Sequence, residues 1–341
     1  MGIKNLHKLL TKWENVISET TIDDYKNKKI AIDISILIYQ IIIAIRNTGT
    51  DITNSRGEIT SHILGIFNKT ISLIEMGIYP VYVFDGKPPN MKNTVLKSRR
   101  EQRKKAKIKM SLALTSDERI KYFKRSVVVT KKQLAECRHL LKLMGMPIVN
   151  APEEADSQCA QLAKDGYVYG VSTEDMDILT FGAPRIIRNL ASRKKNIIEI
   201  NLKDILSNLD INYDQFIDLC ILLGCDYCPT IPGIGMKKSL QIIKKYDSID
   251  NFIKKNNNEP NNEINIKFPE DFQYIKTQKY FKNPSVLQKN EIRLEWNNPE
   301  YDKLEEFLVK KHGFNRNKIL KSINRLKKAC KNYMNYNTVI I

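Results

Sequence analysis

Several short hydrophobic runs recur along the chain, and most of them lead into acidic residues. They span residues 29–34, 79–86, 167–171 and 185–187, and the third leads into the acidic segment 172–177. Runs of this length, rich in β-branched and aromatic side chains, are typical of strands that are buried on both faces. The pattern therefore predicts strands in the interior of a sheet.

Between these runs, hydrophobic residues recur every three or four positions, as they do on one face of a helix. Residues 61–76 and 131–144 have this spacing, and residues 213–224 form a compact apolar segment that predicts another helix. Strands that alternate with helices predict an α/β fold, in which helices flank a mostly parallel central sheet.

Two later segments have a different character. Residues 251–265 are rich in Asn and Lys and predict an exposed loop or linker. Residues 305–331 predict a basic helical tail. The chain has no stretch of about 18 apolar residues, so we predict no membrane span.

Charge points to an anionic partner. The chain has 56 Lys and Arg against 38 Asp and Glu, a formal net charge of +18. Residues 92–109 alone carry nine basic residues and one acid, Glu101. Like charges on one helix repel each other, so this segment favours a nucleic-acid partner over a merely solvated helix face. A basic surface that only aids solubility is the alternative explanation of the overall charge.

The six cysteines show no even spacing, and the chain shows no secretory signal. Both features favour a reduced, intracellular compartment. Cys225 and Cys228 form a C-x-x-C pair, but no second pair follows at the spacing of a zinc site. We expect the cysteines to be small buried thiols.

Seven acids attract attention: four lie at or near the ends of predicted strands, two lie at an expected helix start, and one lies in a turn after a predicted helix. Singly, each has an ordinary explanation, either in turn chemistry at a strand end or at a helix N-terminus. Together they predict a metal site, because converging carboxylates repel unless cations join them and because Mg²⁺ prefers oxygen ligands. On an extended segment, residues 175 and 177 would place their side chains on one face. The seven are Asp33, Asp85, Glu154, Asp156, Asp175, Asp177 and Asp226.

A glycine loop at residues 231–235 precedes another expected helix. Gly233 and Gly235 leave backbone N–H groups accessible to a phosphate, and Lys237 and Lys238 follow directly. Two glycines alone are weak evidence, but the acids and the positive charge together predict a metal-dependent phosphoesterase.

The chain also resembles a known family, the flap endonucleases of the 5′-nuclease superfamily, over residues 1–327. The matching blocks are MGI at 1–3, IAIDIS at 30–35, TSH at 60–62, PVYVFDGKPP at 80–89, APEEAD at 151–156, TEDMDILTFG at 173–182, DLCILLGCDY at 218–227 and GIG at 233–235.

The resemblance implies a PIN-like 5′-nuclease fold with a helical arch over the active site and a helix-turn-helix-like DNA clamp. It divides the chain into an N-terminal nuclease region, an arch and cap segment, an internal nuclease region with the clamp, and a C-terminal helical extension. Their expected bounds are residues 1–104, 105–126, 127–250 and 251–341.

The resemblance also assigns roles to side chains. All seven acids match metal ligands of the family, while Lys92 and Arg99 match catalytic arch residues that steady charge on the scissile phosphate. Tyr39 matches an aromatic on which a nucleotide stacks, and Arg46 matches the wedge that bends the junction. The further DNA-binding residues that we expect are Arg100, Arg103, Gly233, Gly235, Lys237 and Lys238.

The implied activity is a structure-specific 5′-flap endonuclease with 5′–3′ exonuclease activity, acting in DNA replication, on Okazaki fragments, and in repair. Hydrolysis would use two Mg²⁺ ions, which Mn²⁺ can replace, and K⁺ would bind in the clamp. The expected partner is branched DNA with a 5′ flap. We expect a monomer at sites of DNA replication, in the nucleus or, for a viral protein, at a cytoplasmic replication site.

Two departures from the family pattern qualify this picture. Asp156 stands where flap endonucleases usually have Glu, and residues 332–341 contain no sliding-clamp-binding box, so we do not expect clamp binding through that box. The alternatives are a related 5′ exonuclease, excision nuclease or junction resolvase, a non-catalytic DNA-junction binder, and a phosphatase for small substrates. The acids are common to the related nucleases and do not separate them.

Overall fold

The computed structural model describes residues 2–190, 192, 195–258 and 267–337. The chain forms two compact units, and each unit is built from three separate segments. Unit 1 contains Met1–Thr21, Lys87–Val95 and Pro152–Val286. Unit 2 contains Ile22–Gly86, Leu96–Ala151 and Leu287–Ile341.

Unit 2 contains three parallel strands, β2 (Lys29–Asp33), β3 (Tyr79–Phe84) and β4 (Ile148–Asn150). All six residues of β3 are buried, which explains its uninterrupted apolar run. β2 and β3 confirm the predicted strands. β4 was not predicted, because three residues are too few to show a periodicity.

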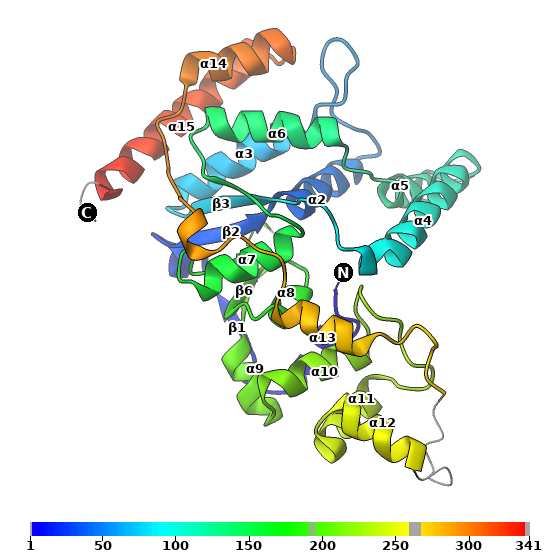
Figure 1. The fold of residues 1–341 in the computed structure, drawn as a ribbon. Helices are drawn as coiled ribbons and strands as arrows, with labels where there is room; N and C mark the ends of the chain where they lie inside the picture. The colour runs from blue at the N-terminus through cyan, green and yellow to red at the C-terminus, as the bar shows by residue number, and fades with distance from the viewer. Residues whose placement is uncertain (1, 191, 193–194, 259–266, 338–341) are drawn as a thin grey trace. The chain divides into compact units, whose positions relative to one another are not determined.

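Helices cover the strands of unit 2. Figure 1 shows α3, α6 and α15 side by side, and Arg325 of α15 binds Glu75 of α3 through two contacts of 2.8 and 2.6 Å. The predicted helices at 61–76 and 131–144 are confirmed as α3 and α6. The helices of this unit are η1 (Ile22–Tyr25), α2 (Ile34–Arg46), α3 (Ser61–Glu75), α5 (Ser116–Arg125), α6 (Lys131–Leu143), η3 (Lys289–Glu291), α14 (Tyr301–Glu305), the π-helix η4 (Glu306–Lys311) and α15 (Arg316–Asn337).

The basic helical tail predicted at residues 305–331 is confirmed by the end of α14, η4 and α15, with a break between the last two. Gly313 adopts a φ of +67° between η4 and α15. Such a left-handed backbone conformation ends a helix, and glycine adopts it without steric cost. The basic segment at residues 92–109 is helical as predicted, within η2 (Asn90–Lys92) and α4 (Asn93–Ser111).

Unit 1 has four strands, β1 (Ile17–Thr20), β5 (Gly170–Ser172), β6 (Arg185–Arg188) and β7 (Ile197–Asn201). β5 and β6 are parallel, whereas β7 runs antiparallel to both β6 and β1. The fold is thus α/β with mixed strand directions. β5 is shorter than the predicted run 167–171, because the backbone N–H of Tyr167 donates to Leu162 at 3.0 Å and closes the preceding helix instead.

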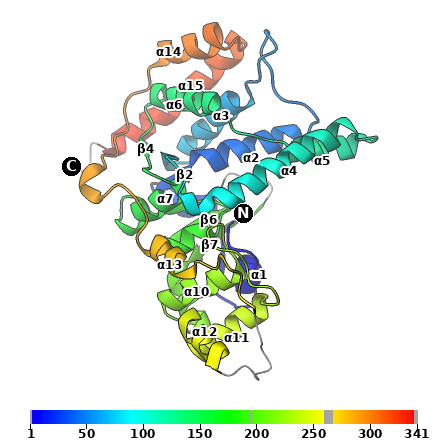
Figure 2. The same ribbon diagram turned by 45° about the vertical axis from the view of Figure 1, so that its right-hand side comes forward.

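Helix α10 of unit 1 contacts α11 and α13, and Figure 2 shows α12 against α11. The helix predicted at residues 213–224 is confirmed as α10. The helices are α1 (Leu6–Leu10), α7 (Ala155–Lys164), α8 (Asp177–Thr180), α9 (Leu202–Leu209), α10 (Tyr213–Leu223), α11 (Met236–Tyr246), α12 (Ile249–Asn258) and α13 (Tyr274–Lys282).

The loop predicted at residues 251–265 is wrong for its first part, because residues 251–258 belong to α12. The helix is fixed at its start, where the N–H of Ile249 donates to the buried carboxylate of Asp218 at 2.9 Å. Phe252 is buried as well. The Asn and Lys residues that suggested a loop therefore follow a helix start that is held by a hydrogen bond and a buried side chain. Residues 259–265 lie outside the described chain.

The cysteines confirm one prediction from composition. All six cysteines are free and buried, as expected for small thiols, and burial raises the pKa of the Cys228 thiol to about 12. Within the described residues, no helix is both long enough and apolar enough to span a bilayer.

Candidate functional site

Two of the predicted metal ligands, Asp33 and Asp85, meet at one edge of unit 2. Asp33 ends β2 and caps α2, and its Oδ1 accepts hydrogen bonds from the N–H groups of Ser35 at 2.7 Å and Ile36 at 3.2 Å. The hydroxyl of Ser35 donates to Oδ2 of Asp85 at 2.6 Å. Because β2 and β3 are parallel, their carboxyl ends share an edge, and Ser35 bridges the two acids there.

Asp175 and Asp177 are joined by a turn in unit 1. The N–H of Asp175 donates to Oγ1 of Thr173 at 3.0 Å, and the N–H of Asp177 donates to Oδ1 of Asp175 at 3.2 Å. Asp177 is the first residue of α8. The prediction that both side chains share one face of an extended segment is therefore wrong, because the Thr173 hydroxyl and the helix start bend the chain.

The carboxyl groups of this turn are buried and repel each other. Burial raises the pKa of Asp177 well above its usual value of 3.8, and the neighbouring Asp175 and Asp226 raise it further. Burial also raises the pKa of Asp175. Asp177 is only 1% exposed, and its Oδ1 has no hydrogen-bond partner among the described residues.

Glu154 occupies the N-cap position of α7, and Asp156 lies in the first turn of that helix. The Oε2 of Glu154 accepts hydrogen bonds from the hydroxyls of Tyr227 at 2.5 Å and Tyr280 at 3.0 Å. Burial raises the pKa of both phenols, so they remain protonated donors at neutral pH. Lys92 binds the other oxygen, Oε1.

Lys92 is the cation within this group of acids. Its Nζ also lies 3.8 Å from Oδ2 of Asp226 and 5.4 Å from the centre of the Tyr227 ring. Burial alone would lower the pKa of the ammonium, but Glu154, with Asp156 and Asp226, raises it above its usual value. We name as the acidic cluster the five acids whose charges interact with Lys92, namely Glu154, Asp156, Asp175, Asp177 and Asp226.

The acidic cluster fits a hard divalent cation in its chemistry. Its donors are all carboxylate oxygens, and no described residue forms a hydrogen bond with the buried Oδ1 of Asp177. Among the residues with described coordinates, no three acid, Cys or His side chains converge as closely as metal ligands do. The Lys92 ammonium pairs with Glu154 and lies 3.8 Å from Asp226, so it neutralises part of the charge of these acids.

The predicted arch residues lie on α4, which begins in unit 1 and continues in unit 2. Ala106 is the one buried residue of this fully described helix, so the basic side chains project from a surface helix. Arg99 and Arg103 are half-buried, and Nε of Arg103 donates to the carbonyl oxygen of Arg99 at 3.0 Å. Arg100 is exposed. Their contact with DNA stays a prediction.

Arg46, predicted as a wedge residue, has other partners in unit 2. Its Nε and Nη2 bind the two carboxylate oxygens of Asp51, each at 3.0 Å, and its Nη1 donates to the carbonyl oxygen of Phe123 at 2.9 Å. The guanidinium also lies 3.9 Å from the centre of the Phe123 ring. Arg46 thus fastens α2 to α5. Tyr39, also on α2, is half-exposed, and the DNA roles of both residues stay predictions.

The glycine loop of unit 1 is open to solvent. Gly233 has a φ of +80°, Gly235 is the N-cap of α11, and no atom lies within 4 Å of where a Cβ would stand on either. Lys237 and Lys238 are exposed in the first turn of the helix. This geometry suits the binding of a phosphate, because N–H groups at the start of a helix face outward.

Gly2 is a site residue that the sequence pattern did not single out. It has a φ of +82°, and a Cβ on it would overlap Oδ1 of Asp175. The sequence showed Gly2 only as part of a matching block. Tyr280 was also missed, because it lies 126 positions from Glu154 along the chain.

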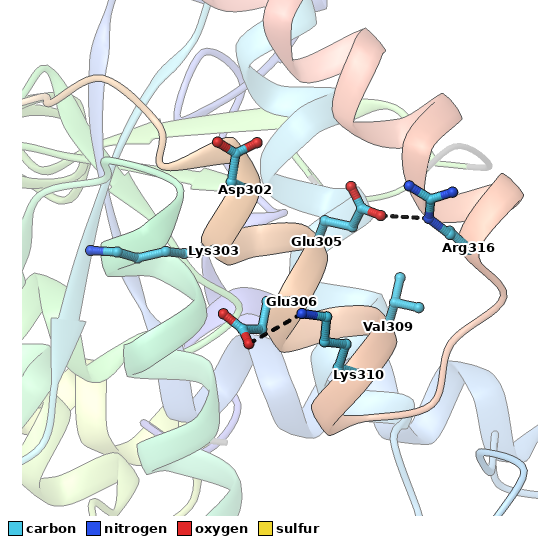
Figure 3. Close-up of a pocket in the computed structure, with 7 residues that line it drawn as sticks. All are labelled: Asp302, Lys303, Glu305, Glu306, Val309, Lys310 and Arg316. Carbon is cyan, nitrogen blue, oxygen red and sulfur yellow. Dashed lines mark hydrogen bonds and ion pairs between the residues drawn. The ribbon is translucent and has the colours of Figure 1, made fainter.

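A surface hollow of about 450 Å³ in unit 2 contains none of the predicted site residues (Figure 3). Two of its acids are paired with bases, Glu305 with Arg316 at 2.6 Å and Glu306 with Lys310 at 3.5 Å. We assign no chemistry to it. The residues that line it are Asp302, Lys303, Glu305, Glu306, Val309, Lys310 and Arg316.

Comparison with known proteins identifies similar sequences. The XPG N-terminal domain matches residues 1–106, and the XPG I-region matches residues 145–226. Flap endonuclease 1-A of Laccaria bicolor is 44% identical over 336 residues, covering 96% of this chain and 85% of that protein. Flap endonuclease 1 of Glycine max is 44% identical over 338 residues, covering 96% and 87%.

Solved structures are similar over nearly the same length. Flap endonuclease-1 from Methanococcus jannaschii has a TM-score of 0.74 and 34% identity, covering 95% of this chain and 99% of that one. The catalytic core of Rad2 in complex with DNA substrate has a TM-score of 0.73 and 26% identity, covering 95% and 99%.

Proposed function

Since this chain belongs to the flap endonuclease family, as relatives 44% identical over 96% of its length show, we propose how its own residues cut DNA. The protein is a 5′ flap endonuclease, and therefore a nuclease of the hydrolase class. To cut a flap, such a protein needs a site that activates water and a surface that holds the phosphate backbone.

We assign divalent-metal binding to the acidic cluster of unit 1. The observation that carries this assignment is Asp177, whose buried Oδ1 has no hydrogen-bond partner in the described chain and whose carboxyl is repelled by Asp175 and Asp226. A bound cation would give this oxygen a partner and would offset the repulsion between the carboxylates. Carboxylate oxygens favour Mg²⁺, and Mn²⁺ accepts the same ligands.

The family resemblance assigns Asp33 and Asp85 to the same ligand set and implies two metal ions per site. The Ser35 bridge supports a joint role, because it holds both carboxylates in one arrangement. Asp156, which replaces the usual Glu, keeps a carboxylate at its position with a shorter side chain. When bound, the metal would lower the pKa of a water molecule and offset negative charge on the phosphate.

We propose that Lys92 and Arg99 stabilise the negative charge of the scissile phosphate. Lys92 stays protonated at neutral pH because the neighbouring carboxylates raise its pKa, so it is a permanent cation beside Glu154 and Asp226. Arg99, on α4, supplies a planar guanidinium that suits phosphate oxygens. Two fixed positive charges would stabilise the negative charge that develops on the phosphate in the transition state.

DNA binding is assigned to the basic side chains of α4 and to the glycine loop. Residues 93–111 form an exposed helix with one acid, Glu101, and the loop presents Lys237 and Lys238 beside open backbone. Phosphate contacts of this kind recognise the shape of a junction rather than its sequence. Tyr39 would stack on a nucleotide, and K⁺ would bind at the loop.

We further propose the cellular role that the family resemblance implies. The protein removes 5′ flaps in DNA replication and repair, with 5′–3′ exonuclease activity on the same substrates. The eukaryotic relatives favour a nuclear location. We propose that it acts as a monomer.

The test is cleavage of a labelled double-flap DNA with Mg²⁺ and with EDTA. We expect cutting near the junction with Mg²⁺ only, and a loss of about 10³-fold or more in Asp175→Ala, because a metal site contributes several kcal/mol to catalysis. Asp302→Ala, in the surface hollow, serves as the control and should cut normally. Undiminished cleavage by Asp175→Ala would remove the assignment, and faster cutting of gapped or four-way DNA would favour a related nuclease.

A further inference from the structure

A hydroxyl from helix α13 reaches the carboxylate of Glu154. Tyr280 and Tyr227 both donate to Oε2, at 3.0 and 2.5 Å, whereas Lys92 binds Oε1. Resting on the metal role proposed for Glu154, we propose that Tyr280 is a positioning residue that holds this carboxylate with Oε1 toward the bound cation. Tyr280 lies outside both segments that match the XPG domains.

Aromatic contacts fix the direction of the Tyr280 hydroxyl. The ring centre lies 5.0 Å from that of Tyr227 and 5.6 Å from that of Phe181, with the Phe181 ring nearly perpendicular to it at 83°. These contacts depend on the ring and not on the hydroxyl. Tyr280→Phe therefore removes a donor to Glu154 and leaves the packing in place.

Two donors on one oxygen restrict the rotation of a carboxylate. With Oε2 held by two phenols, Oε1 is the oxygen left to bind a cation, and in this structure that cation is the ammonium of Lys92. Loss of a hydrogen bond to a metal ligand typically lowers metal affinity about 10–100-fold. Because Tyr227 remains in place, we expect the lower end of this range for Tyr280.

The experiment compares Tyr280→Phe with Tyr274→Phe, a matched control on the same helix. The hydroxyl of Tyr274 donates to Asp250 at 2.6 Å, outside the acidic cluster. Mg²⁺ is titrated into each metal-free protein by calorimetry, and the Mg²⁺ dependence of double-flap cleavage is measured in parallel. We expect Tyr280→Phe to raise the Mg²⁺ dissociation constant and the half-saturating Mg²⁺ concentration about 10-fold.

At saturating Mg²⁺ the Tyr280→Phe protein should cut at close to the wild-type rate, and Tyr274→Phe should match wild type throughout. A purely structural role would leave the Mg²⁺ dependence unchanged. Equal Mg²⁺ affinity in wild type and Tyr280→Phe would overturn the inference, and so would a cleavage defect that saturating Mg²⁺ does not restore.

Burial, Glu154 and also Glu153 raise the pKa of the Tyr280 phenol, so Glu153→Gln is measured as well. We expect it to keep wild-type Mg²⁺ affinity. An equal rise in the Mg²⁺ dissociation constant in Glu153→Gln and Tyr280→Phe would assign the effect to Glu153 and overturn the inference. Wild-type cleavage that persists in EDTA is a separate result, and it would overturn the proposed metal function itself.

Discussion

Glu305 and Glu306 line a surface hollow in which Arg316 and Lys310 pair with them, whereas Asp175 and Asp177 lie buried beside each other (Figure 3). Both places concentrate acids. In the hollow, exposed bases neutralise the acids at little gain or cost in stability. In the acidic cluster, burial and neighbouring acids raise the pKa values of Asp175 and Asp177 and so disfavour their charged forms. Burial and mutual repulsion of the acids, and not their number, therefore distinguish the candidate site.

Removing one base from the acidic cluster and one from the surface hollow should give the largest difference in stability between the two regions. Lys92→Met should lower the free energy of unfolding in EDTA by about 3–5 kcal/mol, because it leaves buried carboxylates without their cation. Arg316→Met in the hollow should cost about 1 kcal/mol or less. Urea unfolding of both variants provides the measurement. Equal decreases in the free energy of unfolding would mean that Lys92 stabilises the cluster no more than Arg316 stabilises a surface ion pair.

A methyl group placed against the acidic cluster should impair cleavage while the acids stay. The Cβ of Gly2→Ala would overlap Asp175, and a displacement of about 1 Å in a catalytic site costs about 100-fold in rate. Gly57→Ala is the control, because Gly57 also has a positive φ, +77°, but no atom within 4 Å of its Cβ position. Cleavage rates at saturating Mg²⁺ decide the outcome, and similar rates for the two variants would contradict the overlap.

Stability should depend on pH in a way that identifies Asp177. Because its pKa is raised well above 3.8 in the folded protein, the folded state binds this proton more tightly than the unfolded state. Stability is then lost as the pH rises from 3.8 through the raised pKa. In EDTA at pH 8, Asp177→Asn should be more stable by on the order of 1 kcal/mol, roughly 2 °C in Tm.

The stability advantage of Asp177→Asn over wild type should shrink toward zero as the pH falls to about 3.8. At that pH the protonated carboxyl of wild-type Asp177 is neutral, as the Asn amide is at every pH. Thermal unfolding followed by circular dichroism between pH 4 and pH 8 measures this trend. Glu305→Gln, in the hollow, should show no comparable gain at pH 8. An Asp177→Asn protein that is less stable than wild type at pH 8 would contradict the repulsion.

The smallest expected effect concerns the glycine loop. Lys237→Ala should weaken binding of double-flap DNA equally for all sequences and reduce the slope of log K against log salt by about 1. Lys254→Ala, at an exposed position of α12, is the control and should leave the slope unchanged. Binding measured by fluorescence anisotropy at several salt concentrations would show a difference, and an unchanged slope for Lys237→Ala would remove the loop from the interface.

The elements with long, regular patterns were predictable from the sequence. α3 and α6 each repeat their hydrophobic spacing over several turns, and β3 is apolar throughout. β4 has only three residues, and the start of α12 depends on Asp218, which lies 31 positions away. Long-range contacts of this kind leave no trace in a local pattern.

The candidate site was predictable in its acids but not in its supporting groups. The strand-end positions of Asp33 and Asp85 followed from the alternation of strands and helices. The turn at Asp175 depends on a hydroxyl of Thr173 that competes with extended backbone, so the extended segment was the wrong expectation. The phenol of Tyr280 comes from a different segment of the chain, and only the folded structure places it on Glu154.

The three-segment construction of unit 1 has a consequence for synthesis on the ribosome. The chain emerges from its N-terminus, at about 5–20 residues per second, so the acids up to Asp226 appear before α13 does. The hydrogen bond from Tyr280 to Glu154 therefore forms after both other parts of the site have been synthesised, because Tyr280 is the later of the two phenol donors in the chain. A nascent chain halted after Asp226 carries every proposed metal ligand yet lacks the helix that completes their support.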